Sequence, residues 1–259
     1  MRSLSALALS AVTVGAVLIG AASPAGAVAN GVPVEEGKYR FSTKLTMTGI
    51  PNPDGSTRNS ACSGALVAAQ WVLTAGHCFR DVNGKRVSGR VPYPTTATLG
   101  RVEASGPGGV DVAVVAVAQS PVNDIALARL AKPVVGRSGK GIEPIRLART
   151  APKAGEVLRL TGWGALDGLS TEPAEHLQTG LVTVESVAET TIGVVGKDPS
   201  PSTSACLYDS GAPYFRETRR GPEVVSTESA GPDCPHFVEE TTARVDVSAD
   251  WIRTTIRGR

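Results

Sequence analysis

Short apolar segments separated by glycine and proline are the feature of this chain that most limits its fold. The 29 Gly and 18 Pro among 259 residues interrupt the sequence too often for long helices to form. Between them lie short Val-rich runs, whose length and flanking turn residues predict strands. Seven segments show this pattern: Ala65–Leu73, Val110–Ala118, Ile125–Leu130, Val157–Trp163, Leu181–Val187, Ile192–Val195 and Val224–Ser226. The fold class is therefore predicted to be all-β, as an antiparallel barrel or sandwich.

The remaining segments predict connections and one short helix. Ile50–Ser60 and Ser105–Gly109 are expected to form surface loops, and Pro133–Arg149 is expected to link two halves. Near the end of the chain, Ser248 can cap a terminal helix with one apolar face. That face carries Trp251, Ile252, Thr255 and Ile256.

Residues 1–27 have the composition of a secretory signal peptide. Arg2 supplies the positive start, Leu4–Ile19 is an uncharged apolar stretch, and Ala25-Gly26-Ala27 is a small-x-small cleavage site. A transmembrane anchor is the weaker interpretation, because the apolar run is shorter than the roughly 20 residues that a span needs. Cleavage after this site predicts a secreted, extracellular chain of residues 28–259 without a membrane anchor.

Charge and cysteine content exclude several classes of function. The formal net charge is +2, and Lys and Arg are scattered without a basic stripe, so no nucleic-acid partner is expected. The four cysteines form no C-x-x-C metal-binding pattern, and no cofactor or metal ion is predicted. In a chain marked for export, an even number of cysteines favours two disulfides, for which three pairings are possible.

Three short motifs carry the residue types of acyl-transfer chemistry. His77 ends the run Thr74-Ala75-Gly76-His77, Asp124 precedes an apolar strand, and Ser210 is the centre of Asp209-Ser210-Gly211. A serine nucleophile, a histidine base and an aspartate that orients the base are the members of a hydrolytic triad. Their order in the chain, His then Asp then Ser, is that of one known triad arrangement.

The main alternative among hydrolases, the G-x-S-x-G elbow of α/β-hydrolases, does not fit. The residue two positions before Ser210 is Tyr208, and that fold places its histidine last in the chain. His176 and His236 lack the surroundings of His77 and are interpreted as ordinary loop histidines.

The segments around the three motif residues resemble the chymotrypsin/trypsin-like serine peptidases. Trp71–Cys78, Asn123–Leu127 and Ser204–Pro213 resemble that family's histidine, aspartate and serine motifs, and the likeness covers essentially everything after the leader. The chain is therefore identified as a secreted member of the bacterial, two-disulfide type. The resemblance implies two six-stranded antiparallel β-barrels with a short C-terminal helix. It also implies barrel boundaries of about 28–140 and 141–259, with the site in the cleft between the barrels.

The family resemblance favours one of the three cysteine pairings. It implies Cys62–Cys78 and Cys206–Cys234, so that each bridge closes a loop around one of the two residues His77 and Ser210. Bridges of this kind typically contribute about 2–4 kcal/mol each to stability.

The resemblance also assigns backbone and activation roles. In that family, the N–H groups of the serine and of the residue two before it form the oxyanion hole, here Ser210 and Tyr208. The family has glycine at the position of Tyr208, and a side chain there restricts the peptide's orientation. If this limits the donor, Tyr208→Gly should raise the rate of acylation. The resemblance further implies that a newly cut Val28 α-ammonium pairs with Asp209, whereas a cut after Ala29 would leave too short an arm.

The substrate pocket is expected around Ser204, Ser226, Thr227, Glu228 and Glu240. The run from Ser226 to Glu228 is aligned with the family's substrate-binding strand, although Thr and Glu replace Trp and Gly. Ser204, six residues before the candidate nucleophile, is an uncharged floor that permits large apolar side chains. Acidic walls at the two glutamates would instead favour Arg or Lys, although most glutamates point to solvent. Both specificities therefore stay open.

Together these residues predict a secreted serine endopeptidase that hydrolyses peptide bonds through an acyl-enzyme. The expected partner is a protein or peptide substrate, and the chain is expected to act as a monomer. The alternative is a trypsin-fold binding or regulatory protein with weak or no catalysis, which the changes in the oxyanion hole and substrate strand favour. An esterase with little peptidase activity lies between the two.

Overall fold

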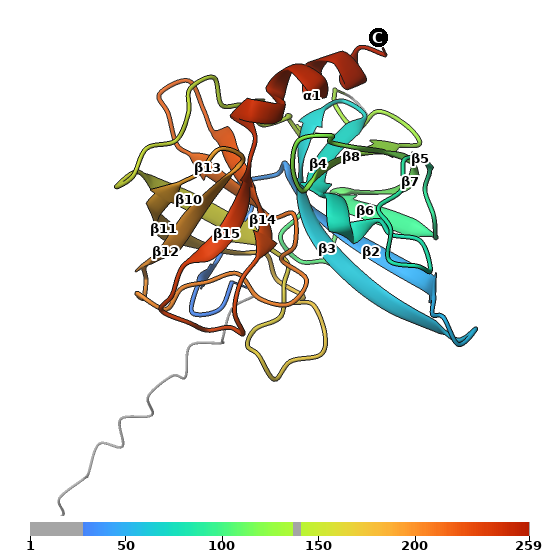
Figure 1. Cartoon of the computed structure of the whole chain (residues 1–259), viewed down its shortest axis with the longest axis horizontal. Helices are drawn as coiled ribbons and strands as arrows, with labels where there is room; N and C mark the ends of the chain where they lie inside the picture. The colour runs from blue at the N-terminus through green and yellow to red at the C-terminus, as the bar shows by residue number, and fades with distance from the viewer. Residues whose placement is uncertain (1–27, 137–140, 259) are drawn as a thin grey trace, which may run out of the picture.

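The computed structural model describes residues 28–136 and 141–258, so the expected signal peptide lies outside the described residues. Almost all regular structure is strand, arranged as two β-barrels side by side with a short helix, α1, at one end (Figure 1). The prediction of two six-stranded antiparallel barrels and one short C-terminal helix is confirmed.

The first barrel consists of six antiparallel strands that close on themselves. Their order around the barrel is β2, β3, β4, β8, β7 and β6, and β6 pairs again with β2. A two-residue strand, β5, extends the sheet at β7. The bounds are β2 Ser42–Pro51, β3 Thr57–Ala68, β4 Trp71–Ala75, β5 Gly89–Arg90, β6 Thr95–Leu99, β7 Val110–Gln119 and β8 Ile125–Leu130, with a 3-10 turn, η1, at Gly76–Cys78.

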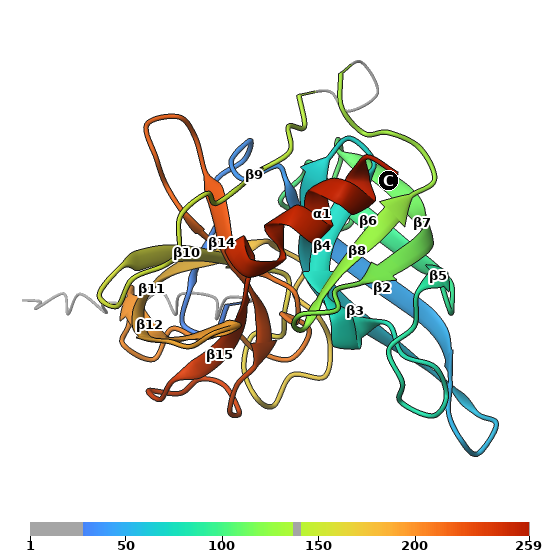
Figure 2. The ribbon, with the colours of Figure 1, turned by 45° about the horizontal axis from the view of Figure 1, so that its top comes forward.

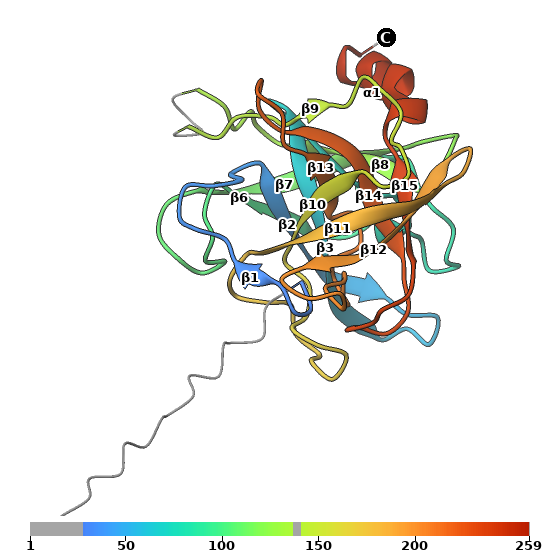
Figure 3. The same cartoon turned by 90° about the vertical axis from the view of Figure 1, so that its left-hand side faces the viewer.

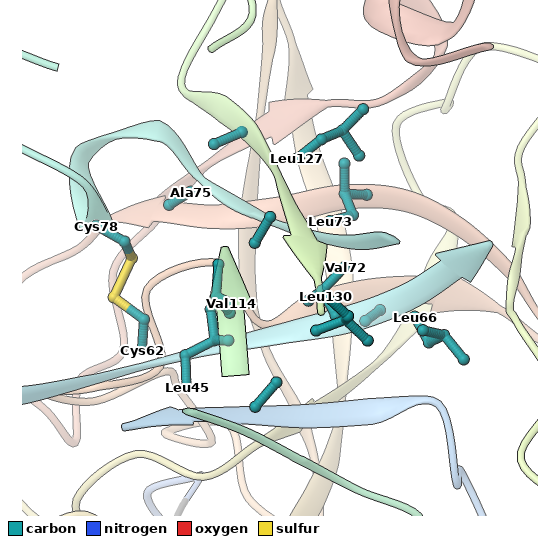
Figure 4. Packing of buried hydrophobic residues seen from close by; sticks show 14 of the residues in the cluster. Leu45, Cys62, Leu66, Val72, Leu73, Ala75, Cys78, Val114, Leu127 and Leu130 are labelled. Carbon is teal, nitrogen blue, oxygen red and sulfur yellow. A yellow bond between two sulfur atoms is a disulfide. The ribbon is translucent and has the colours of Figure 1, made fainter. Parts of the chain in front are cut away.

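Leucine and valine side chains fill the interior of this barrel. Leu45, Leu66, Leu73 and Leu127 come from four different strands and are fully buried (Figure 4). Burying one such side chain stabilises the fold by about 1.5–3 kcal/mol. The disulfide between Cys62 and Cys78 lies beside this cluster, where it joins β3 to the turn after β4.

The second barrel closes in the same way. Its strands follow the order β10, β11, β12, β15, β14 and β13, and β13 pairs again with β10. The bounds are β10 Val157–Gly162, β11 Gln178–Val187, β12 Thr191–Asp198, β13 Pro213–Arg216, β14 Glu223–Ala230 and β15 Glu240–Arg244.

Both ends of the described chain cross from one barrel to the other. β1 (Val32–Pro33) precedes the first barrel in sequence but pairs with β11 of the second, and Figure 3 shows it beside that sheet. At the other end, α1 (Ala249–Ile256) follows β15 through a 3-10 turn, η2 (Asp246–Ser248), and lies next to β4 (Figure 2). Ile252 of α1 is fully buried in a cluster that consists mainly of the core of the first barrel and also includes Phe215 and Val224 of the second. Each barrel is therefore completed by residues from the other half of the chain.

Two expectations about segments need correction. Ala65–Leu73 is divided between β3 and β4, because a tight turn at residues 69–70 reverses the chain. Ile50–Ser60 is not a loop: its two ends pair as the tip of the long β2–β3 hairpin, which projects from the first barrel in Figure 1. Its strand residues are mostly polar and exposed, so they lack the apolar alternation by which strands are recognised.

The remaining expectations concern connections and the helix cap. Ser105–Gly109 contains no strand or helix, as expected. The Pro133–Arg149 segment connects the barrels and contains β9 (Arg146–Leu147), which pairs in parallel with β14. Ser248 occupies the N-cap position of α1, but its hydroxyl makes no capping bond and donates to Asn123 Oδ1 at 2.9 Å.

Candidate active site

His77 and Asp124 are brought together by the pairing of two strands. β4 and β8 are antiparallel neighbours with Ala75 opposite Ile125, so the residues just after β4 and just before β8 meet at one edge of the sheet. The backbone N–H of His77 donates to Asp124 Oδ1 at 2.9 Å, and His77 Nδ1 lies 2.6 Å from Asp124 Oδ2. Because a carboxylate can only accept, Nδ1 is the nitrogen that carries the hydrogen.

The residue before Asp124 anchors this edge to the second barrel. The amide of Asn123 donates to the backbone oxygens of Thr190 at 3.1 Å and Arg244 at 2.9 Å. Asp124 therefore sits at the junction of the two barrels, in a position fixed from both sides.

The carboxylate of Asp124 is held in its ionised form. Burial alone would raise its pKa, but hydrogen bonds from His77 and Ser229 and the charge of the imidazole outweigh burial, and the pKa lies below its usual range. The hydroxyl of Ser229 donates to Oδ2 at 2.8 Å. An ionised, oriented carboxylate fixes the histidine tautomer and stabilises imidazolium.

Ser210 lies in the loop between β12 and β13 and reaches the histidine across the cleft. Its Oγ is 2.8 Å from His77 Nε2, the nitrogen left free to accept its proton. Gly211 makes this close approach possible, since a Cβ there would lie 2.2 Å from Thr74 Oγ1. The loop is further tied to the first barrel, where Ser63 N–H donates to the Ser210 carbonyl at 2.9 Å.

The loop before Ser210 presents two backbone donors. Tyr208 has φ +76°, in the left-handed region that favours glycine. Its hydroxyl donates to the Thr171 carbonyl at 2.7 Å, which holds the side chain away from the backbone. Among the described residues, no acceptor is recorded for the N–H of Tyr208 or of Ser210. Both N–H groups are therefore available to a ligand.

Asp209 is a fully buried carboxylate without a cationic partner among the described residues. It accepts hydrogen bonds from Gly164 N–H at 2.7 Å and Cys206 N–H at 3.0 Å. Desolvation by burial raises the pKa of Asp209 well above its ordinary value, against the effect of those bonds. Val28 is also fully buried, and Ala29 forms an antiparallel bridge with Ser204. No contact between Val28 and Asp209 is recorded in the described part of the chain, in which the Val28 nitrogen is still an amide.

A cavity of about 350 Å³ opens beside Ser210 in the second barrel. Both glutamates expected at the pocket line it, whereas Ser226 and Thr227 are buried elsewhere, and Ser226 Oγ accepts from Thr242. Ser204 is buried, and its Oγ has no hydrogen-bond partner among the described residues. It does not line the cavity, whereas the next residue, Ala205, does. The lining residues are Gly168, Ala205, Cys206, Leu207, Ser210, Glu228, Ser229, Ala230, Gly231, Pro232, Asp233, Cys234 and Glu240.

The segment that borders the pocket is thus displaced by three residues from the expected alignment. Ser229, rather than Ser226, contacts Asp124, and Ser229 to Gly231 line the cavity. The disulfides Cys62–Cys78 and Cys206–Cys234 are both confirmed. The second bridge ties the residues just before Cys234 to the loop of Ser210, so counting back from Cys234 would have located them.

The two glutamates do not point to solvent. Glu228 and Glu240 are 5% and 2% exposed, and the hydroxyl of buried Tyr214 lies 2.8 Å from Glu228 Oε2 and 2.6 Å from Glu240 Oε1. Burial, and then the charge of Glu240, raise the pKa of Glu228 well above its usual value. Burial likewise raises the pKa of Tyr214. A carboxyl cluster therefore forms one wall of the pocket.

A second cavity, of about 320 Å³, lies on the other side of Ser210. It is bordered by His77, Tyr208, Tyr93 and the β2–β3 hairpin, including Arg58. Ser210 thus stands between two hollows, so an extended chain could place one residue on each side of it.

Two further features of the described residues bear on function. Nowhere in residues 28–136 and 141–258 do three or more His, Cys, Asp or Glu side chains gather so that they could hold a metal ion. No helix within the same ranges has both the length and the apolar character of a membrane span.

Comparison with known proteins gives consistent matches. The family model Trypsin matches residues 28–252. Mouse Serine protease 56 is 31% identical over 196 residues, which cover 70% of this chain and 28% of that protein. Trypsin epsilon of Drosophila erecta is 27% identical over 212 residues, which cover 76% of this chain and 78% of that protein.

Among solved structures, neuropsin, a serine protease expressed in mouse brain, shares the fold with a TM-score of 0.67 and 21% identity. That match covers 87% of this chain and 98% of the neuropsin chain. The chain spans little more than a quarter of the length of mouse Serine protease 56. With the family match extending over most of its length, the chain belongs to the trypsin family of serine proteases.

Proposed function

We propose that this protein is a secreted serine endopeptidase that hydrolyses protein or peptide substrates through an acyl-enzyme. The observation that carries the proposal is the chain of contacts from Asp124 through His77 to Ser210, with distances of 2.6 and 2.8 Å. Beside it lie two backbone N–H groups that have no acceptor within residues 28–136 and 141–258. Nucleophile, base and orienting carboxylate within hydrogen-bond reach are the geometry of acyl transfer.

Each group has a defined part in the proposed reaction. Ser210 Oγ attacks the scissile carbonyl while its proton moves to His77 Nε2, and Asp124 stabilises the resulting imidazolium. The oxyanion accepts hydrogen bonds from the N–H groups of Tyr208 and Ser210. The intermediate then collapses, and His77 gives its proton to the leaving amine. A water molecule, deprotonated by His77, hydrolyses the ester in the same way.

The alternative of a weakly catalytic binding protein rests mainly on Tyr208. The tyrosine takes the φ value at which glycine is usually found, and the hydrogen bond of its hydroxyl supports that conformation. Residue 208 therefore has a side chain where the family has glycine, but its backbone takes the φ region that favours glycine, which favours the endopeptidase over the binding protein.

We also propose that signal cleavage activates the protein directly. Asp209 is a buried carboxylate for which the described part of the chain supplies no counter-charge, and Ala29 already pairs with Ser204 in the second barrel. A free α-ammonium at Val28, after a cut behind Ala27, would supply that charge. Residues 28–259 would then be the peptidase domain, acting as an extracellular monomer. That the chain is of the bacterial, two-disulfide type stays a prediction.

Covalent labelling tests the proposed function. The secreted protein should react with a fluorophosphonate probe and cleave members of a peptide library. Ser210→Ala should lose both activities while it keeps secretion yield and thermal stability, because within the described residues the hydroxyl of Ser210 has a recorded hydrogen bond with His77 alone. Labelling or turnover that survives in the Ser210→Ala variant would refute the assignment of the nucleophile. A stable wild-type protein without labelling would favour the binding-protein alternative.

A further inference from the structure

His236 was expected to be an ordinary loop histidine, but it lies directly behind the pocket wall. It is 9% exposed, and its Nε2 is 3.5 Å from Glu240 Oε2, an ion-pair distance rather than a hydrogen bond. Its Nδ1 lies 2.9 Å from the Val238 carbonyl oxygen. Both ring nitrogens thus face oxygen atoms that can only accept, so the contacts are satisfied when both nitrogens carry hydrogen. The geometry favours the charged imidazolium.

The charge that His236 faces can be assigned from the number of protons in the cluster. The Tyr214 hydroxyl has one hydrogen but lies within bonding distance of both Glu228 and Glu240. For both contacts to be hydrogen bonds, one carboxyl must be protonated. Glu240 also accepts from Ala205 N–H at 3.1 Å and lies 3.5 Å from His236 Nε2, whereas burial raises the pKa of Glu228 well above its usual value. The shared proton is therefore assigned to Glu228, which leaves Glu240 as the carboxylate that faces His236.

Glu240 is the group through which the pocket contacts this cluster. Glu240 lines the cavity beside Ser210, and His236 does not. Gly231 lies over the pair, since a Cβ there would be 3.5 Å from Glu240 Oε2 and 3.6 Å from His236 Nε2. Glu240 thus has the pocket on one side and the imidazole on the other. A positive charge in the pocket and a proton on His236 would compete for the same carboxylate.

We propose that His236 is a counter-ion built into the wall of the substrate pocket. The pocket selects a lysine or arginine side chain through Glu240, and it does so more strongly once His236 has lost its proton. The choice of substrate rests on the proposed endopeptidase function, whereas the competition between the two cations does not. Because the two cations bind the same carboxylate, each lowers the affinity for the other.

The sign of the pH dependence follows from the surroundings of His236. Its interaction with Glu240 outweighs the effect of burial and raises the pKa of His236 above its ordinary value. Below that raised pKa, the imidazolium neutralises Glu240; above it, the carboxylate keeps its hydrogen bonds from Tyr214 and Ala205 but has lost the positive charge beside it. The other ionisable groups of this region are buried Glu228, Tyr214 and Asp209, and the exposed carboxylates Asp233 and Glu239. No cationic side chain lines the described pocket.

Turnover gives the first test. The quantity to measure is the ratio of kcat/KM for a lysine substrate to that for its uncharged norleucine analogue, between about pH 5.5 and 9. Any effect of pH on the groups that act on the scissile bond is common to both substrates and cancels in this ratio. We expect the ratio to rise with pH by about tenfold, the effect of one partly desolvated ion pair. A ratio that is flat, falls with pH, or favours norleucine throughout would overturn the proposal.

Variants separate the two residues. His236→Gln should have a high ratio at all pH values, and Glu240→Gln a low ratio at all pH values. Glu239→Gln is the matched control, since this exposed neighbour of Glu240 does not line the pocket, and its ratio should follow the wild-type curve. A wild-type pH dependence that persists in His236→Gln would overturn the role of His236.

A binding measurement keeps the test independent of catalysis and of variant folding. The Nε2 and Nδ1 environment of His236 can be followed by NMR in the intact protein, with benzamidine as the cation and benzamide as its neutral analogue. Benzamidine should bind more tightly as pH rises and should lower the pKa of His236, whereas benzamide should do neither. If benzamidine binds independently of pH, or fails to bind, the inference is refuted even in an active enzyme. If benzamidine shows the expected linkage in a protein without turnover, the inference stands and the proposed function fails.

Discussion

Replacing Tyr208 by glycine should change the rate of acylation by less than about threefold. The structure already has residue 208 at φ +76°, with its N–H free of any recorded acceptor among the described residues. The side chain therefore does not move the donor. This expectation differs from the hypothesis drawn from sequence, in which glycine would release a restricted backbone and raise the rate.

Stability should change little in the same variant, because opposing effects are similar in size. Glycine removes left-handed strain of about 1–2 kcal/mol. It also loses the hydrogen bond to the Thr171 carbonyl, worth about 1 kcal/mol, and adds about 0.5–1 kcal/mol of unfolded-state entropy. The net change should lie within about 1 kcal/mol. Tyr208→Phe loses only the hydrogen bond, so it should be destabilised by about 1 kcal/mol with the φ value retained.

Two measurements check this reasoning. Single-turnover acylation with an activated amide substrate reports the donor, and urea unfolding reports stability. One oxyanion donor is worth about 100- to 1000-fold in rate. A rise of this size in Tyr208→Gly would show that the native N–H is misaligned and would refute the argument from φ.

Three further predictions concern Asn123 at the barrel junction, buried Glu228 and the terminus at Val28. Asn123→Ala should lose about 2 kcal/mol of stability and about tenfold in kcat/KM, because two hydrogen bonds to the second barrel disappear. Asn52→Ala is the control in urea unfolding and turnover assays, because the Asn52 amide donates to Ser56 at the exposed hairpin tip, away from the second barrel. In the wild-type protein, the raised pKa of Glu228 means that protonated Glu228 contributes fully to stability below the unfolded-state pKa of about 4.3. This contribution is lost as pH rises toward the folded-state pKa. Glu228→Gln does not titrate, so this decline should be absent from the variant. Urea midpoints across pH should therefore be flatter in the variant, and an equally steep decline would contradict this. Terminal sequencing of the secreted protein should find Val28 as the first residue. Pairing with Asp209 should raise the pKa of the Val28 amine above its free value of about 7.7–8.0, so activity should persist below the free value and fall as pH rises through the raised pKa. Full activity in a form extended by one residue before Val28 would contradict this.

The three motifs around His77, Asp124 and Ser210 could be found in the sequence because each is a local signal. His77 and Asp124 adjoin buried strands, and Ser210 lies in a short run four residues after a cysteine. Two of the strands that escaped prediction are rich in threonine: β6 has the sequence TTATL and β15 has ETTAR. Threonine suits strands but hides the alternation of apolar and polar residues.

The pocket was less predictable because its residues meet only through long-range structure. Ser226 was aligned with the family's substrate-binding strand because it follows a valine. The serine that contacts Asp124 is Ser229, three residues later, and a glutamate precedes it. His236 had no motif at all. Its position behind Glu240 depends on how the loop after Cys234 folds back, which the spacing of four residues outside a helix does not reveal.

The division of labour between the barrels explains why the site depends on the whole chain. His77 and Asp124 belong to the first barrel, whereas Ser210 and the carboxyl cluster belong to the second. A shift of about 1 Å between reacting groups can cost about 100-fold in rate, so the two barrels must be held in a fixed relation. The crossed ends supply this: β1 joins the second barrel, and Ile252 of α1 completes the core of the first. Asn123 adds direct bonds across the junction, beside the carboxylate of Asp124. Catalysis should therefore be more sensitive than stability to changes along this junction.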